Sequence, residues 1–123
     1  MTRYFSQEHE WIEIEGDLGT VGITDYAQGQ LGDITFVDLP EAGAAFGKGD
    51  SVAVVDSVKA ASDVYTPVSG TIAEANGALT DEPELVNTQA ETGGWLFRVT
   101  LSDASELEAL MDEAAYKQYV ESL

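Results

Sequence analysis

Short runs of alternating apolar and polar residues fill the first third of the chain, a pattern typical of β-strands that are buried on one face. WIEIE, a Gly16-Asp17 turn and LGTVGI together predict a hairpin over residues 11–23. Thr24 is placed to cap a short helix over DYAQGQL, and DITFVDL at residues 33–39 alternates again. The segment EAGAAFGKGD, which is rich in glycine and alanine, is expected to be a loop.

The middle of the chain is arranged around Lys59. Two extended runs, residues 50–58 and 60–68, meet at this lysine and predict a lysine hairpin, which we place at residues 52–68. A further strand is expected at residues 71–75. NGALTDEPELVN is typical of a turn, a short helix and a turn, and GWLFRVTL predicts the last strand.

The C-terminal segment has helical spacing instead of alternation. Asp103 suits an N-cap and Glu106 its capping-box partner. Two apolar sets follow at helical spacing: Leu107, Leu110, Met111 and Ala114, then Tyr116, Tyr119, Val120 and Leu123. We therefore predict a helical segment over residues 103–121, and a mainly β fold of the α+β class with helix packed at the C-terminal end.

Length and composition indicate one globular domain. The chain has 123 residues, of which 44% are hydrophobic, enough for a single modest core. No apolar run approaches the roughly 20 residues that cross a bilayer, so a transmembrane protein is not expected. The N-terminal sequence lacks the apolar core of a signal peptide and is too acidic for a transit peptide, so we expect a cytoplasmic protein.

The charge balance narrows the range of partners. Five basic residues stand against 23 acidic ones, giving a formal net charge of −18. Nucleic acid and anionic membranes are excluded as expected partners, because phosphate contacts need clustered lysine and arginine. The acidity could serve docking to basic partners or adaptation to high salt. The acids are scattered along the whole chain, which favours the salt adaptation.

Few residues are suited to catalysis or metal binding. The chain has no cysteine and one histidine, so a zinc site or a catalytic triad would have to use His9 alone. HEW lacks the second histidine of a zincin motif, since Glu13 stands there. Lys48 lies between two glycines without the other residues of a phosphate loop, and a surface turn is expected there. We expect no enzymatic activity of the chain's own, and any redox group must be attached to it.

Lys59 is the best candidate for such an attachment. It is one of three lysines, and small residues surround it in DSVKAASD, so that its side chain is unobstructed at the tip of a hairpin. An accessible amine on a rigid turn suits a modifying enzyme and can anchor a prosthetic arm. A plain solvated lysine on a surface turn would have the same local sequence. The residues alone leave both explanations open.

A wider resemblance favours the first explanation. DSVKAASDVYTPVSGTIAEAN resembles the lipoylation hairpin of the glycine cleavage system H protein family, which are lipoyl carriers. Residues 9–43, LVN at residues 85–87 and GGWLFRV at residues 93–99 are similar to the same family in the same order, so the resemblance spans roughly residues 3–120. Other lipoyl domains share the lysine hairpin but not HEW or ITDYAQ, and biotin carriers place their lysine between methionines.

The resemblance implies a single lipoyl-carrier domain over residues 1–123, with the lipoyl/biotinyl-type, hammerhead-like fold of a flattened β-barrel sandwich. It includes a short helix in the N-terminal half and a C-terminal helix. Lys59 would carry lipoate in amide linkage. The carrier would receive an aminomethyl group from a pyridoxal-phosphate glycine decarboxylase, deliver it to an aminomethyltransferase, and present its dithiol to dihydrolipoyl dehydrogenase. A lipoate-protein ligase or a lipoyl/octanoyl transferase would attach the lipoate.

Three further positions, Glu10, Asp63 and Asp56, acquire expected roles from the resemblance, whereas Gln30 departs from the family pattern. Glu10 and Asp63 match family positions that hold the aminomethyl ammonium in a surface cleft. Asp56 matches a glutamate that the lipoylating enzyme recognises, and Gln30 stands where some members have histidine. For His9 a structural role is favoured.

Trp11 and Trp95 are expected to be core aromatics and not walls of the cleft. The segment AETGGW at residues 90–95 departs from the family pattern, so its loop is expected to differ. Two alternatives remain: a variant carrier that relays lipoyl groups to other acceptors, and an interaction domain without lipoate.

Overall fold

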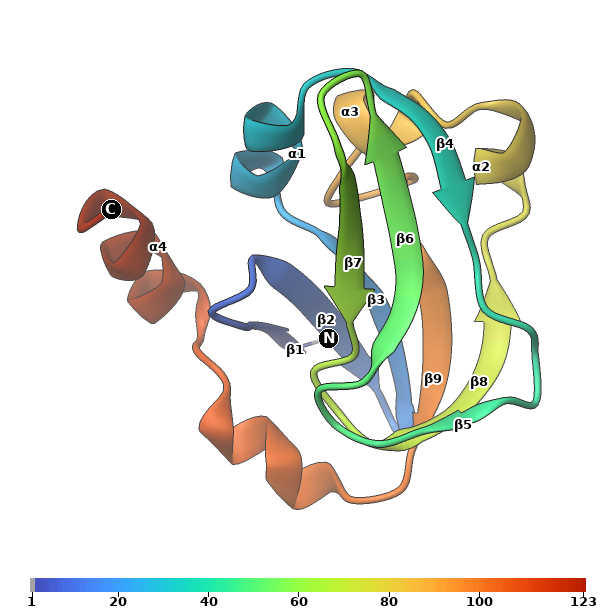
Figure 1. Cartoon of the computed structure of the whole chain (residues 1–123). Helices are drawn as coiled ribbons and strands as arrows, with labels where there is room; N and C mark the ends of the chain where they lie inside the picture. Colours follow the sequence, from blue (N-terminus) through green and yellow to red (C-terminus); the bar gives the residue numbers. More distant parts are fainter. Residues whose placement is uncertain (1) are drawn as a thin grey trace.

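The computed structural model describes residues 2–123 as two antiparallel β-sheets with short helices around them (Figure 1). The larger sheet has six strands, in spatial order β1 (Thr2–Phe5), β2 (Glu10–Glu15), β3 (Leu18–Ile23), β9 (Phe97–Leu101), β8 (Gly70–Ala75) and β5 (Ala45–Phe46). The smaller sheet has three: β4 (Ile34–Asp38), β6 (Ser51–Ser57) and β7 (Ala61–Tyr65). The helical segments are α1 (Asp25–Leu31), α2 (Ala78–Asp81), α3 (Leu85–Thr88), the 3₁₀ helix η1 (Ala104–Ala109) and α4 (Glu113–Glu121).

The core lies between the two sheets. Buried apolar residues from both sheets join in one cluster, among them Ile12, Val21, Ile72 and Val99 from the larger sheet and Ile34, Val55 and Val64 from the smaller. Burying these side chains is the main favourable contribution to the stability of such a fold. The sheets do not merge into a closed barrel within residues 2–123, so the fold is a flattened sandwich. The prediction of a mainly β fold with a short N-terminal-half helix and a C-terminal helix is confirmed.

Local signals explain several elements. Gly16 takes a left-handed φ of 65° between β2 and β3, a conformation that glycine adopts without strain. The Thr24 hydroxyl accepts a hydrogen bond from the Ala27 amide and so caps α1, as predicted. No helix in residues 2–123 is both long enough and apolar enough to span a bilayer.

The predicted elements differ from the structure in the shortest segments. The strands β1 and β5 were not predicted, and β5 lies inside the segment expected to be a loop. The short helix expected within residues 76–87 is two helices, α2 and α3. The last strand begins at Phe97, three residues later than predicted, because Gly94, Trp95 and Leu96 approach the sheet without extending the ladder.

The helical segment predicted over residues 103–121 is interrupted, and consists of η1 and α4. Asp103 does cap η1 by accepting from the Ser105 amide, but Glu106 does not complete a capping box. Its carboxylate accepts instead from the amide and hydroxyl of Ser69, at 2.7 and 2.8 Å. Met111 then forms a β-bridge with Phe5, which breaks the helix before α4 begins.

Candidate functional site

The turn of the lysine hairpin is fixed by Ser57. The Ser57 amide donates to the Ala60 carbonyl at 2.9 Å. Its hydroxyl accepts from the amides of Lys59 and Ala60, both at 3.2 Å, and donates to the Ala60 carbonyl at 3.0 Å. Hydroxyls that bond to neighbouring backbone groups stabilise turns of this kind. The turn is therefore held by its backbone and one serine. The exposed side chain of Lys59 takes no part in holding it.

The side chain of Lys59 lies against the end of α1. A Cβ built on Gly32, which caps α1 at its C-terminus, would lie 3.5 Å from Lys59 Cε. The Val58 amide donates to the Asp33 carbonyl at 3.1 Å, which ties the turn to the same segment. Figure 1 shows this hairpin tip beside α1 and α3. Within residues 2–123, Lys59 forms no ion pair with a carboxylate.

A cleft of about 250 Å³ lies between α1 and β7. Its size suits a small group or the end of a flexible arm, since pockets for drug-sized ligands begin at roughly 300 Å³. The lining residues come from the turn before β2 and its first residue, from the end of β3, from α1 and from β7: Glu8, His9, Glu10, Ile23, Ala27, Gln30, Leu31, Ser62, Asp63 and Val64. The cleft therefore brings together Glu10, Asp63 and Gln30, three positions that the sequence had singled out.

Glu10 is buried in this cleft, with 2% of its surface exposed. Its Oε1 accepts from the Ser6 hydroxyl at 2.9 Å and its Oε2 from the Tyr65 amide at 2.7 Å. The pKa of Glu10 is raised to about 7, chiefly by burial and least by nearby Glu8, while the two hydrogen bonds oppose the rise. Glu10 is thus a carboxyl group with fixed orientation that changes charge near neutral pH.

The other predicted acidic residues differ in position. Asp63 is exposed on β7 at the cleft, where its Oδ1 accepts from the Ser51 hydroxyl at 3.2 Å. Asp56 is half-buried on β6, paired with Phe36 and Ala61 in the smaller sheet, and does not line the cleft. Asp63 and Glu10 therefore line the same cleft, and Asp56 lies outside it.

Glu8 is a third carboxylate at the cleft, and the sequence did not identify it. Nothing in its local sequence distinguishes it from the other acidic residues of the chain. His9 is the residue between the two glutamates, and it has a left-handed φ of 64°. Glu8 lies in the turn before β2, outside the alternating run of the strand, so strand periodicity gives no reason to place it in the cleft with Glu10.

His9 contacts tyrosine side chains of α1 and α4. Its Nδ1 lies 2.9 Å from the Tyr116 hydroxyl, which also lies 2.8 Å from the Thr24 hydroxyl. The His9 ring packs on Tyr26, with ring centroids 4.6 Å apart. Burial lowers the pKa of His9, which favours the neutral ring in this cluster. These contacts favour the structural role, although His9 also lines the cleft.

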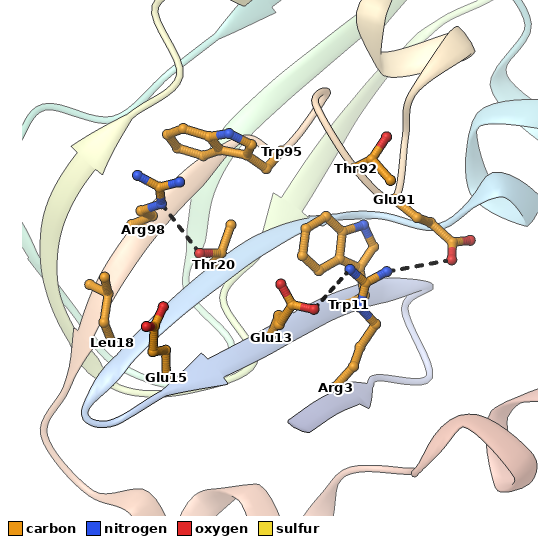
Figure 2. Close-up of a pocket in the computed structure, with 10 residues that line it drawn as sticks. All are labelled: Arg3, Trp11, Glu13, Glu15, Leu18, Thr20, Glu91, Thr92, Trp95 and Arg98. Carbon is orange, nitrogen blue, oxygen red and sulfur yellow. Dashed lines mark hydrogen bonds and ion pairs between the residues drawn. The ribbon is translucent and has the colours of Figure 1, made fainter. Parts of the chain in front are cut away.

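A second cavity, of about 590 Å³, lies on the outer face of the larger sheet and includes both tryptophans (Figure 2). Trp11 is 1% exposed, and its Nε1 donates to the carbonyls of Ile23 and Ala90, so it is the core aromatic that was predicted. Trp95 is only half-buried, beneath the Arg98 guanidinium at 4.2 Å from the ring centroid. Trp95 nevertheless packs against the buried cluster of Phe5, Trp11 and Tyr116, so it lies at the margin of the core and also lines this cavity.

Both arginines of this second cavity are paired with glutamates. Arg3 bonds to Glu13 at 3.3 Å and lies 3.7 Å from Glu91, and Figure 2 shows its guanidinium between the two. Arg98 bonds to Glu74 at 2.7 Å. None of the residues that line this cavity comes from α1, β6 or β7. The smaller cleft, beside Lys59, is therefore the better candidate site.

The chain is similar to proteins of one family over nearly its whole length. Residues 3–123 match the family model described as the glycine cleavage H-protein. The chain is 58% identical over 117 residues to the glycine cleavage system H protein of Bartonella tribocorum, covering 95% of this chain and 96% of that protein. It is 57% identical over 118 residues to the protein of the same name from Escherichia coli O7:K1, covering 95% and 92%.

A solved structure is similar over the same length. The crystal structure of a glycine cleavage system H protein from Mycobacterium marinum matches with a TM-score of 0.89 at 36% identity, covering 98% of this chain and 97% of that one. The family is a lipoate-carrying one, and an accessible lysine beside a small acidic cleft is suited to such a group. The match of sequence and fold over nearly the whole length shows that the chain belongs to the glycine cleavage H-protein family.

Proposed function

We propose that this chain is a single-domain shuttle that carries lipoate in amide linkage on Lys59. The observation that supports it best is the placement of Lys59 on a turn fixed by Ser57, with its stem against Gly32 beside the Glu10 cleft. Amide formation removes the lysine charge and would change the net charge from −18 to −18 − 1 = −19. The anchored group would supply the redox-active sulfur that a chain without cysteine lacks.

The shuttle would serve three enzymes in turn. It would take an aminomethyl group from glycine decarboxylase, present it to aminomethyltransferase, and return as a dithiol to dihydrolipoyl dehydrogenase. Tethering a cargo in this way keeps it at high effective concentration for each successive partner. The chain's own residues would bind, orient and shield the cargo, without a reaction step of their own.

Glu10 and Asp63 would hold the cationic end of the arm. An ammonium group entering the cleft favours the ionised form of Glu10, because an opposite charge nearby lowers a carboxyl pKa. At neutral pH Glu10 is close to half ionised, so this deprotonation costs little. Ser6 and Tyr65 keep the carboxylate oriented before the cation arrives. Asp63, exposed at the cleft, would add a second, solvent-screened attraction.

Asp56 would act in recognition by the lipoylating enzyme, either a lipoate-protein ligase or a lipoyl/octanoyl transferase. It lies three residues before Lys59 on the same hairpin and outside the cleft. A substitution Asp56→Ala is therefore expected to slow lipoylation. The same substitution should leave the lifetime of the loaded arm unchanged once lipoate is attached.

Peptide mass mapping tests the attachment. Protein purified from its native host should carry lipoate on Lys59, and not on Lys48 or Lys117. Lipoate on another lysine, or on none, contradicts the carrier assignment. Reconstitution with glycine decarboxylase and aminomethyltransferase then separates the glycine shuttle from lipoyl relay, because only the shuttle gives glycine-dependent transfer of a one-carbon unit.

A further inference from the structure

Asn87, at α3, is bonded to both sides of the segment on which the Lys59 stem lies. Its Oδ1 accepts from the Ile34 amide at 2.8 Å. Its Nδ2 donates to the Gly32 carbonyl at 2.9 Å and to Gln28 Oε1 at 3.0 Å. One amide side chain thus joins the last turn of α1, the Gly32-Asp33 segment and the start of β4. These are three hydrogen bonds out of the four that an asparagine side chain commonly makes.

The segment that Asn87 holds is also the one that contacts the lysine turn. Gly32 lies under the aliphatic stem of Lys59, and a Cβ there would come within 3.5 Å of Cε and 3.8 Å of Cδ. The Asp33 carbonyl accepts a hydrogen bond from the Val58 amide at 3.1 Å. The position of the hairpin tip relative to the body therefore depends on the position of Gly32-Asp33.

The direction of the stem follows from the same contacts. Ala27, Gln30 and Leu31 of α1 form one wall of the Glu10 cleft and lead directly to Gly32. Ser62 and Asp63 of β7 contribute to the other wall and follow closely after Lys59 in the chain. A stem that lies on Gly32 therefore starts at one end of the space between these walls.

We propose that Asn87 is a positioning residue for the prosthetic arm, because it holds the Gly32-Asp33 segment that aligns the Lys59 stem with the Glu10 cleft. The effect on the arm rests on the proposed function. The position of the Gly32-Asp33 segment, which we call the geometric part, can be tested in the unmodified chain. Asn87 contacts neither Lys59 nor Glu10 by a hydrogen bond, so it acts through Gly32 and Asp33 alone.

The geometric part is tested by NMR on the unmodified protein. The wild-type protein should show an NOE between Gly32 Hα and the Lys59 ε-methylene protons, and slow exchange of the Val58 amide. Asn87→Ala should remove the NOE and speed that exchange at least about tenfold, as expected for the loss of a fixed hydrogen-bonded segment. Thr88→Ala is the matched control, since its exposed hydroxyl bonds only to the Glu84 carbonyl within α3. An NOE and exchange rate unchanged in Asn87→Ala overturn the proposal.

Asn87→Asp is the second variant, in case the alanine variant does not fold. Aspartate keeps the acceptor for the Ile34 amide but loses both donated bonds, including the one to Gly32. It should therefore show the same loss of the NOE while retaining the start of β4. Retention of the NOE in a folded Asn87→Asp protein would also overturn the proposal.

The functional part is tested by the lifetime of the aminomethylated arm, normalised to the fraction of Lys59 that mass spectrometry finds lipoylated. Asn87→Ala should shorten this lifetime several-fold, and should shorten it no further when combined with Glu10→Gln. Additive effects of the two substitutions would indicate a general loss of structure and overturn the positioning role. If Glu10→Gln shortens the lifetime and Asn87→Ala does not, only this inference fails. If Lys59 carries no lipoate, the proposed function fails, while the NMR result still decides the geometry.

Discussion

The buried carboxyl group of Glu10 makes the stability of the unmodified protein depend on pH, and Glu10→Gln isolates that dependence. Glutamine has nearly the same shape and is neutral at every pH, so the difference between wild type and variant removes the titration of all other acids. Glu10 is 2% exposed, and burial is the largest cause of its raised pKa. The expected effect is a difference curve that changes only where Glu10 titrates.

The magnitude follows from the two pKa values. The pKa of Glu10 rises from 4.5 to about 7 on folding. Between these values the unfolded chain has lost the proton while the folded chain still holds it, so raising the pH favours unfolding. The span is 7 − 4.5 = 2.5 pH units, and one unit corresponds to about 1.4 kcal/mol, which gives about 3 kcal/mol. Wild type should lose most of this stability relative to Glu10→Gln as the pH rises from 4.5 to 7, and the difference should level off about one pH unit above the folded pKa, where Glu10 is fully ionised in both states.

Urea unfolding followed by tryptophan fluorescence measures the effect, at constant ionic strength and at pH values from 4.5 to 8. The buried Trp11 and half-buried Trp95 both report on unfolding. Glu8→Gln is a second test, because Glu8 contributes to the raised pKa of Glu10, and removing it should move the Glu10 transition to slightly lower pH. A flat difference curve for Glu10→Gln would show that Glu10 titrates at its ordinary pKa, and would refute the reasoning from burial.

The other predictions concern packing, hydrogen bonding and salt. Gly70→Ala should destabilise the protein by about 3 kcal/mol or more, because its Cβ would overlap the Thr100 carbonyl oxygen; a melting temperature within 2 °C of wild type would contradict this. Tyr116→Phe should cost about 1–3 kcal/mol in urea unfolding, since it leaves Thr24 and His9 without their shared hydroxyl partner; an unchanged midpoint argues against that network. The melting temperature should rise with added salt, and a flat or falling curve contradicts salt adaptation.

Much of the fold could be predicted because its signals are local. Alternation over WIEIE and LGTVGI predicts β2 and β3, and the hydroxyl of Thr24 predicts the start of α1. The two-residue strand β5 is too short for any periodicity to show. Glu106 has the sequence of a capping-box residue, but Ser69, 37 positions earlier, competes for its carboxylate. A contact of that sequence separation has no local signature.

The candidate site depends on contacts of the same long-range kind. The turn at Lys59 could be predicted because it is formed by residues that are close in sequence, above all Ser57. The burial of Glu10 depends on the Tyr65 amide, 55 residues away, which only the packing of the two sheets brings close. Asn87 stands in a recognisable LVN segment, yet its bonds to Gly32 and Ile34 cannot be inferred from that segment.

Within residues 2–123, the cleft holds acidic side chains without a cation of the chain's own. Ionising a buried carboxyl group is costly unless the charge is paired or well hydrogen-bonded. None of the five lysine and arginine side chains lines the cleft, although Arg3 and Arg98 pair with glutamates elsewhere on the larger sheet. Glu10 therefore keeps a raised pKa, because its hydrogen bonds from Ser6 and Tyr65 offset only part of the cost of ionisation. A cation delivered to the cleft from the Lys59 side would offset that cost, so the same burial that destabilises the unmodified protein at neutral pH would strengthen its hold on a charged cargo.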